Sequence, residues 1–289
     1  MENWVQQIIN TKRGDFEIFV KGSGEPICVT HHYSEFNSSG DYFADVFTEQ
    51  NQVILVNLRE AGESAKAEEP HQLSMIEAVL DLEGMREALG LNSWSYAGHS
   101  TGGMLGVLYG IHFSQSIDSL IIVGSAAREY SSSEGCIYNK THVDFELMQS
   151  LIEKLKHTGL PETERKEITR QRTMLSIFRS ELHDEYFNKN ISKKMSSKRL
   201  NFFSREVLIF DVTRQLHKIT AKTLILCGRH DVQCPVLFSE EMNQLIPSSK
   251  LHIFENSNHY PFLEEESQFK SAVRHFLKSA RSAKNENHN

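Results

Sequence analysis

Gly98-His99-Ser100-Thr101-Gly102 has the G-x-S-x-G pattern that presents a serine nucleophile on a sharp turn between a strand and a helix. The segment before it, residues 93–97, is short and aromatic, which is typical of a strand. Residues 104–113 are apolar nearly all round, as in a helix buried under a sheet. Such a turn has space only for small residues two positions before and after the serine, and the two glycines meet this demand. The stretch therefore predicts a strand, a sharp turn and a helix.

A serine hydroxyl is a weak nucleophile until a base takes its proton and an acid orients that base. Residues 223–228 read as a strand ending in glycine, and Asp231 follows where a strand-end acid would lie. Residues 251–254 read as the next strand, and His259 lies in the polar loop after it. The sequence thus predicts Ser100 as nucleophile, Asp231 as acid and His259 as base, in the order Ser, acid, His.

Three segments together carry a resemblance to a known family. They are Gly98-His99-Ser100-Thr101-Gly102-Gly103, Cys227-Gly228-Arg229-His230-Asp231 with Pro235 soon after, and Asn258-His259-Tyr260-Pro261. The chain resembles the α/β-hydrolase fold family, in the capped branch that contains proline iminopeptidases and small-ester carboxylesterases. The resemblance implies a mostly parallel eight-stranded sheet with flanking helices, and a helical cap inserted after the sixth strand.

The chain divides into three parts. Strands alternate with helices in residues 1–125, which indicates a parallel sheet and makes this the first part of the core, with the nucleophile. Residues 126–217 change to helical periodicity with few strand signals, and we expect them to form the helical cap. Residues 218–289 are predicted to complete the core and to carry the acid and the base.

Composition limits the classes of partner. The net charge of −7 argues against a nucleic-acid surface, which would need basic patches. The first residues lack the basic and apolar run of a signal peptide, and no apolar stretch approaches the ~20 residues that cross a bilayer, so we expect a cytoplasmic protein without a membrane partner. The four cysteines lack metal-site spacing, and no metal or cofactor is expected. The oligomeric state stays open.

An oxyanion hole needs two backbone N–H groups aimed at the charge that develops on the substrate. Thr101, directly after the nucleophile, should supply one. Relatives usually have His-Gly where this chain has His31-His32, and the resemblance then implies Tyr33 as the second donor. His32 in place of glycine departs from the family pattern. We expect His32 and His99, which flank the predicted donors and nucleophile, to contribute to substrate binding.

The predicted reaction is acyl transfer from a small ester or related acyl compound through an acyl-enzyme. The alternative is a proline iminopeptidase-like aminopeptidase acting on a short peptide, in which a cap acid such as Glu206 anchors the free amine. A third possibility is a member of the fold that only binds a ligand. The fold alone does not choose among these functions, because one scaffold hosts many reactions.

Overall fold

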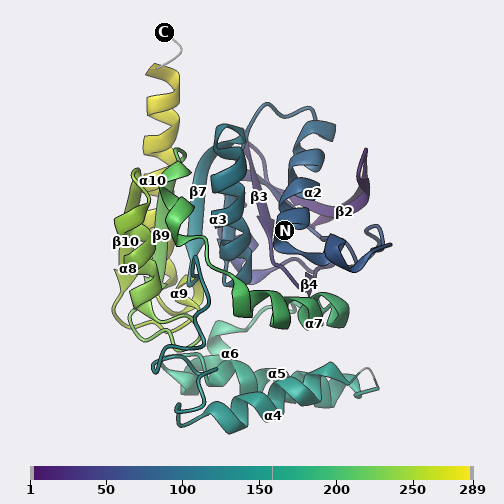
Figure 1. The fold of residues 1–289 in the computed structure, drawn as a ribbon, viewed down its shortest axis with the longest axis vertical. Helices are drawn as coiled ribbons and strands as arrows, with labels where there is room; N and C mark the ends of the chain where they lie inside the picture. Colours follow the sequence, from purple (N-terminus) through teal and green to yellow (C-terminus); the bar gives the residue numbers. More distant parts are fainter. Residues whose placement is uncertain (1–2, 158, 287–289) are drawn as a thin grey trace.

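An eight-stranded sheet runs through the molecule in the order β1-β2-β5-β3-β6-β7-β9-β10 (Figure 1). The computed structural model describes residues 3–157 and 159–286. Strand β2 is antiparallel to both of its neighbours, and every pairing from β5 to β10 is parallel. This confirms the predicted mostly parallel sheet. The strands are β1 Val5–Thr11, β2 Gly14–Lys21, β3 Glu25–Thr30, β5 Asn51–Val56, β6 Trp94–His99, β7 Ile117–Val123, β9 Lys222–Gly228 and β10 Ser249–Phe254.

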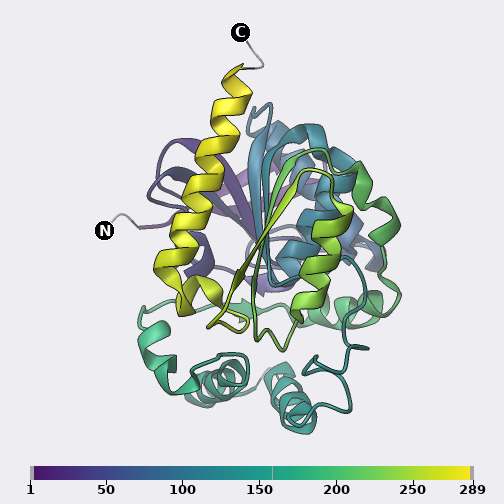
Figure 2. The same ribbon diagram turned by 90° about the vertical axis from the view of Figure 1, so that its left-hand side faces the viewer.

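Helices cover both faces of the sheet. Helices α2, α3 and α8 pack on one face, while α1, α9 and α10 pack on the other (Figure 2). Among the described residues, no helix is both long enough and apolar enough to cross a membrane. The helices are α1 Tyr42–Asp45, α2 Met75–Ala88, α3 Thr101–Phe113, α4 Phe145–Lys156, α5 Glu162–Met174, α6 His183–Tyr186, α7 Ser197–Glu206, α8 Val236–Leu245, α9 Pro261–Glu264 and α10 Glu266–Glu286.

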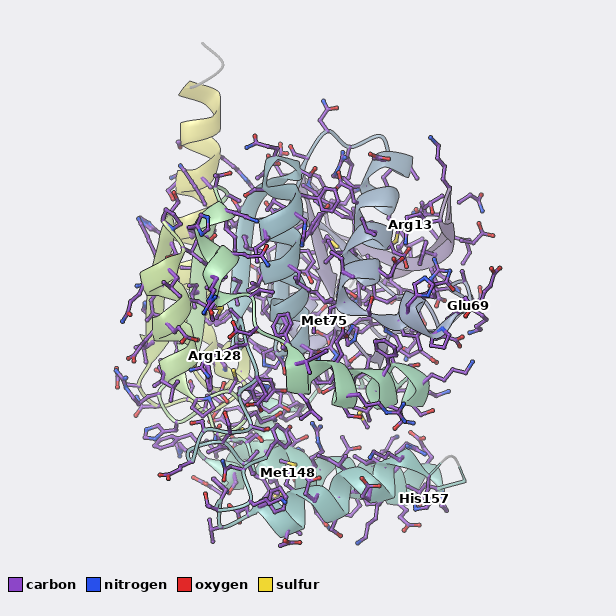
Figure 3. The ribbon with its side chains drawn as sticks, in the orientation of Figure 1. Arg13, Glu69, Met75, Arg128, Met148 and His157 are labelled. Atoms are coloured by element: carbon purple, nitrogen blue, oxygen red, sulfur yellow. The ribbon has the colours of Figure 1, made fainter. Side chains whose placement is uncertain are left out.

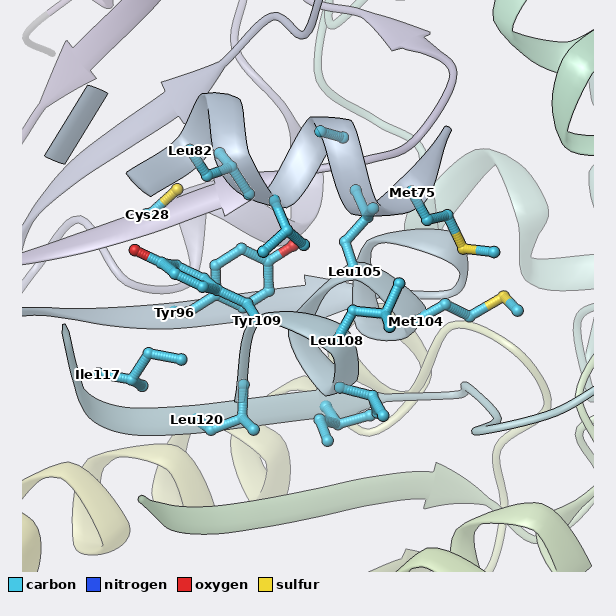
Figure 4. Close-up of a cluster of buried hydrophobic side chains, with 14 of the residues drawn as sticks. Cys28, Met75, Leu82, Tyr96, Met104, Leu105, Leu108, Tyr109, Ile117 and Leu120 are labelled. Atoms are coloured by element: carbon cyan, nitrogen blue, oxygen red, sulfur yellow. The ribbon is translucent and has the colours of Figure 1, made fainter. Parts of the chain in front are cut away.

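The core has two halves because successive strand residues point to opposite faces. Cys28 and Tyr96 belong to the cluster under α2 and α3, whereas their neighbours Val29 and Ala97 belong to the cluster under α10. Figure 4 shows the first cluster, in which Tyr109 of α3 packs beside Tyr96. Apolar burial on both faces explains why the central strands are continuous apolar runs, and it fixes α3 against β6.

Within the described residues, four α-helices lie between β7 and β9, the sixth and seventh strands of the large sheet in chain order. We call residues 124–221, which join these strands, the cap segment. Helices α4 and α5 pack on each other through Leu151, Leu155 and Ile168, and α7 lies between them and the sheet (Figure 1). The side chains of Met148 and His157 mark the layer farthest from the sheet in Figure 3.

A second, two-stranded sheet was not predicted from the sequence. Strand β4 (Ser34–Glu35), in the loop after β3, pairs antiparallel with β8 (Lys194–Met195) of the cap segment. Two residues are too few to show a strand periodicity, so only the distant partner defines this pairing. It ties the loop that carries Tyr33 to the cap segment.

Tyr109→Phe tests how α3 is held against the sheet. The Tyr109 hydroxyl accepts a hydrogen bond from the Trp94 indole N–H at 2.9 Å and donates one to Glu83 at 2.7 Å. Because Trp94 is fully buried, removing the hydroxyl leaves its N–H without a partner. The free energy of unfolding should fall by about 1–3 kcal/mol in urea titrations. Tyr186→Phe, on the partly exposed α6, is the control. Equal stability of Tyr109→Phe and the wild-type protein would contradict this account.

Candidate active site

Ser100 stands in a strained turn between β6 and α3. Its φ of 56° and ψ of −123° are values that residues other than glycine rarely adopt. A Cβ atom at Gly102 would lie 2.2 Å from the Thr30 carbonyl oxygen, and one at Gly98 would lie 2.1 Å from the Gly102 carbonyl oxygen. The turn therefore requires glycine at both positions, as the pattern predicted. Because of this turn, Ser100 lies directly after the end of β6, where it lines a pocket.

Asp231 and His259 form a buried pair. The Nδ1 atom of His259 lies 3.0 and 2.9 Å from the two carboxylate oxygens of Asp231. A carboxylate only accepts hydrogen bonds, so Nδ1 carries the proton and Nε2 of the neutral ring is left as the acceptor. The Asp231 carboxylate also accepts the backbone N–H groups of Gln233 and Cys234 at 2.9 and 2.8 Å. These bonds fix the carboxylate in the orientation that holds the imidazole.

Ser100 and His259 line the same small pocket. Its wall is polar, with hydroxyl, amide and thiol groups beside the backbone of the loop after β7. The Ser125 hydroxyl in this wall is buried and has no hydrogen-bond partner in the described part of the chain. The pocket-lining residues are Tyr33, Ser100, Gly124, Ser125, Ala126, Tyr130, Tyr138, Gln233, Cys234 and His259.

The Thr101 side chain ties the loop after β3 to the start of α3. Its hydroxyl lies 3.0 Å from Nε2 of His31 and accepts the His32 backbone N–H at 3.3 Å. The other ring nitrogen of His31 lies 3.0 Å from the Ser34 hydroxyl. The first N–H groups of a helix have no partner within the helix, so the N–H of Thr101 is available. Tyr33 lines the pocket that contains Ser100.

Among the described residues, no cluster of three or more His, Cys, Asp or Glu side chains could hold a metal ion.

His32 is directed into the interface with the cap segment and is absent from the pocket lining. Its Nδ1 atom accepts a hydrogen bond from Arg199 at 2.9 Å, and the Arg199 Nε–H donates to the His32 carbonyl. Burial, with the charge of Arg199 and the neighbouring His31, lowers the pKa of His32 well below its usual value. The residue that replaces the family's glycine is thus a neutral anchor for α7. This geometry does not favour the predicted role in substrate binding.

His99 supports the loop of His259. Its Nε2 atom lies 2.8 Å from the His259 carbonyl oxygen, and because a carbonyl only accepts, Nε2 carries the proton. The two rings lie 4.5 Å apart between centroids. Burial lowers the pKa of His99 well below its usual value, and the nearby His259 acts in the same direction, so the ring is neutral. The structure places His99 behind His259 and outside the pocket lining, which does not favour the predicted role in substrate binding.

Glu206, the last residue of α7, lies against the start of α2 and is absent from the pocket lining. Its two carboxylate oxygens accept the backbone N–H of Met75 at 2.9 and 3.2 Å, and Figure 3 labels Met75 at this junction. Burial raises the pKa of Glu206, and the Met75 N–H partly offsets that effect. The predicted amine anchor is therefore engaged in a helix cap, which gives it a structural role.

The loop that carries His259 is held by two residues that sequence analysis missed. The backbone N–H of His259 donates to the Ser176 carbonyl of the cap segment at 3.1 Å. The Glu264 carboxylate accepts the N–H groups of Phe178, Asn258 and Tyr260 at 2.7, 3.0 and 3.1 Å. The carboxylate of Glu264 thus joins the cap segment to the loop that carries His259. Only the contact between distant segments reveals this role.

Glu264→Gln tests the charge of the carboxylate that joins these two segments. Burial raises the pKa of Glu264 to about 7, although its three N–H partners lower it. Between pH 4.5 and about 7, the folded protein therefore holds a proton on Glu264 that the unfolded chain has lost. The contribution of Glu264 to the free energy of unfolding is thus present at low pH and is lost as the pH rises through about 7. Glutamine keeps an acceptor oxygen and cannot ionise.

The stability of Glu264→Gln relative to wild type should accordingly rise by up to about 3 kcal/mol from pH 5 to pH 8. Urea unfolding at four pH values measures this difference, and an equal m value in both proteins shows that only stability has changed. A difference that is constant with pH would refute the titration of Glu264.

Comparison with known proteins agrees with this fold. An α/β-hydrolase of known structure from Bacillus anthracis str. Sterne is 40% identical, with a TM-score of 0.91, over 96% of this chain and 100% of its own. A proline iminopeptidase from Heyndrickxia coagulans is 24% identical over 89% of this chain and 92% of its own length. An esterase from Exiguobacterium antarcticum, 24% identical over 95% of this chain and all of its own, shares the fold with a TM-score of 0.71. The family model for the alpha/beta hydrolase fold matches residues 30–266, and the chain belongs to that family.

Proposed function

We propose that this protein is a serine hydrolase that cleaves a small ester or related acyl substrate through Ser100, His259 and Asp231. The observation that carries the proposal is the strained Ser100 in one pocket with His259, whose Nδ1 is held by the buried Asp231. Each of these three side chains has the environment that its role requires. Membership of the α/β-hydrolase fold family supports the same reaction class.

In the proposed reaction, Nε2 of His259 removes the proton of the Ser100 hydroxyl as its oxygen attacks the substrate carbonyl. The imidazolium that forms is stabilised by Asp231. The leaving alcohol departs with a proton from His259, and the acyl group remains on Ser100. Water then attacks the acyl-enzyme while His259 takes a proton from it. The bond between Ser100 and the acyl group breaks as His259 returns that proton to the Ser100 oxygen, and the acid leaves.

The backbone stabilises the charge on the substrate oxygen in this proposal. Thr101 supplies one N–H at the start of α3, where the helix dipole favours negative charge. Tyr33 supplies the other from the loop that the Thr101 hydroxyl holds in place through His31 and His32. Because Arg199 anchors the His32 carbonyl, the loop keeps one conformation without the glycine that relatives have.

The names of relatives support the aminopeptidase alternative. The carboxylates of the cap segment support it less. It needs a carboxylate that is free to bind a protonated amine. Glu206 is occupied by a helix cap, and Glu181 is exposed at the surface, where it pairs with Arg179 at 3.3 Å. These observations favour the ester over the peptide as substrate.

Ser100→Ala should lower kcat for a nitrophenyl ester by about 10⁴ to 10⁶, as in other triads. A fluorophosphonate should label Ser100 in the wild-type protein, located by mass spectrometry of the modified peptide, and the variant should stay unlabelled. Ser132→Ala, at an exposed serine, is the matched control and should keep wild-type turnover. Near-normal turnover in Ser100→Ala would refute the assignment of the nucleophile.

Short nitrophenyl esters and a proline anilide separate the two substrate classes. After the Ser100→Ala background is subtracted from both, we expect turnover of the esters and little of the anilide, because the pocket offers no free carboxylate to the amine among its described lining residues. Fast anilide turnover with a strict need for a free amine would overturn the ester hypothesis in favour of an aminopeptidase.

A further inference from the structure

Arg199 of helix α7 binds the loop that carries Tyr33. Its side chain is fully buried. The Nε atom donates to the His32 backbone carbonyl, Nη2 donates to Nδ1 of the His32 ring at 2.9 Å, and Nη1 donates to the Arg59 carbonyl at 3.1 Å. We call the two bonds to His32 the clamp. A guanidinium is planar with its N–H groups in fixed directions, so the clamp fixes the orientation of its partner as well as its position.

The clamp acts on the peptide group that contains the Tyr33 N–H. A peptide group is planar and trans, so its C=O and N–H bonds point in opposite directions. The carbonyl of His32 and the N–H of Tyr33 belong to one such group. Because Arg199 holds the carbonyl toward α7, the N–H points away from α7. Tyr33 lines the pocket of Ser100, so this direction decides whether its N–H reaches a substrate oxygen there.

The neighbouring peptide groups of the loop are held as well. The N–H of His32 donates to the Thr101 hydroxyl at 3.3 Å, and the carbonyl of Tyr33 accepts the Ser196 N–H at 2.8 Å. In the described part of the chain, the Tyr33 N–H itself has no hydrogen-bond partner. The loop thus keeps one backbone donor unused between bonded peptide groups. A fixed, unpartnered N–H in a pocket wall is what an oxyanion donor requires.

The positive charge of Arg199 is directed at this peptide group. Its bonds go to two carbonyls and a neutral imidazole, and it forms no ion pair within residues 3–157 and 159–286. Burial lowers the pKa of Arg199 to about 10, so the side chain is still protonated near pH 7. A charged donor on a peptide carbonyl polarises the peptide group and makes its N–H a better donor. The clamp therefore both orients and strengthens the Tyr33 N–H.

We propose that Arg199 is a positioning residue that directs the Tyr33 N–H at the oxyanion, so that the cap segment completes the oxyanion hole. The inference rests on the proposed function. Arg199 contacts neither the substrate nor Ser100 in this scheme. Its effect is felt in the transition state, where the substrate oxygen becomes negative, and much less in the complex with the neutral ester. Loss of Arg199 should therefore lower kcat far more than it changes KM.

Arg199→Met removes the clamp and keeps an unbranched side chain. The kcat for a short nitrophenyl ester should fall by about 10- to 100-fold, because the Tyr33 N–H is loosened but still present, and KM should change little. Arg205→Met, at an exposed arginine of the same helix, is the matched control and should keep the wild-type kcat.

An aryl trifluoromethyl ketone distinguishes positioning from general damage. The Ser100 oxygen adds to its carbonyl carbon, the serine proton passes to His259, and the ketone oxygen becomes the oxyanion. The Ki of this adduct should rise in Arg199→Met by the factor by which kcat/KM falls. A fluorophosphonate should still label Ser100 completely, at a lower rate. A merely structural role would not make Ki follow kcat/KM while KM stays constant.

The outcomes separate the inference from the proposed function. Unchanged kcat and Ki in folded Arg199→Met, or a rise in KM that accounts for the whole loss, would overturn the role of Arg199 while Ser100-dependent hydrolysis is retained. A wild-type protein that shows neither fluorophosphonate labelling nor ester turnover would instead overturn the proposed hydrolase.

Urea titration shows whether Arg199→Met is folded. If it is not, Arg199→Lys decides, because lysine keeps the charge and loses the planar pair of donors. The Ki of the trifluoromethyl ketone should then rise by about 5- to 10-fold, with little change in KM. Wild-type kcat and Ki in Arg199→Lys would overturn the inference.

Discussion

The left-handed backbone of Ser100 is the constraint on which the site depends. Such a conformation costs about 1–3 kcal/mol and persists only where the surroundings determine it. Here Gly102 packs its α-carbon against the Thr30 carbonyl, and the Tyr96 hydroxyl donates to the Gly102 carbonyl at 2.8 Å. Strand β3 and helix α3 must therefore meet at the end of β6. The buried face of α3 provides the packing energy that offsets the strain, so the fold and the position of the proposed nucleophile have one origin.

The loop of His259 follows a different logic, because no helix or strand defines its shape. Its backbone N–H groups are taken up by Glu264 and by the Ser176 carbonyl, and its own carbonyl by His99. Two of these partners lie on the core and one on the cap segment. The cap segment consequently acts on the position of the imidazole as well as on access to it. Movement of the cap segment would alter the hydrogen bonds of the proposed base.

How much of this was visible in the sequence depends on the range of the interactions. The central strands could be predicted because burial on both faces makes them apolar runs. Ser100, Asp231 and His259 could be proposed as site residues because each follows such a strand at its carboxyl end. The roles of His32 and Glu206 could not, since both depend on contacts with segments more than a hundred positions away, Arg199 and Met75. Strand β8 was missed for the same reason, because it is defined by its pairing with the distant strand β4.

The carboxylates around the pocket bear on the choice between ester and peptide. A protonated N-terminal amine in a poorly solvated site needs an acceptor that is free to bind it. Asp231 and Glu264, the carboxylates near His259, already accept hydrogen bonds from several N–H groups. No Asp or Glu side chain is among the described residues that line the pocket. The proposed acyl transfer at Ser100 needs no such acceptor, which is why a neutral ester suits this pocket better than a free amine.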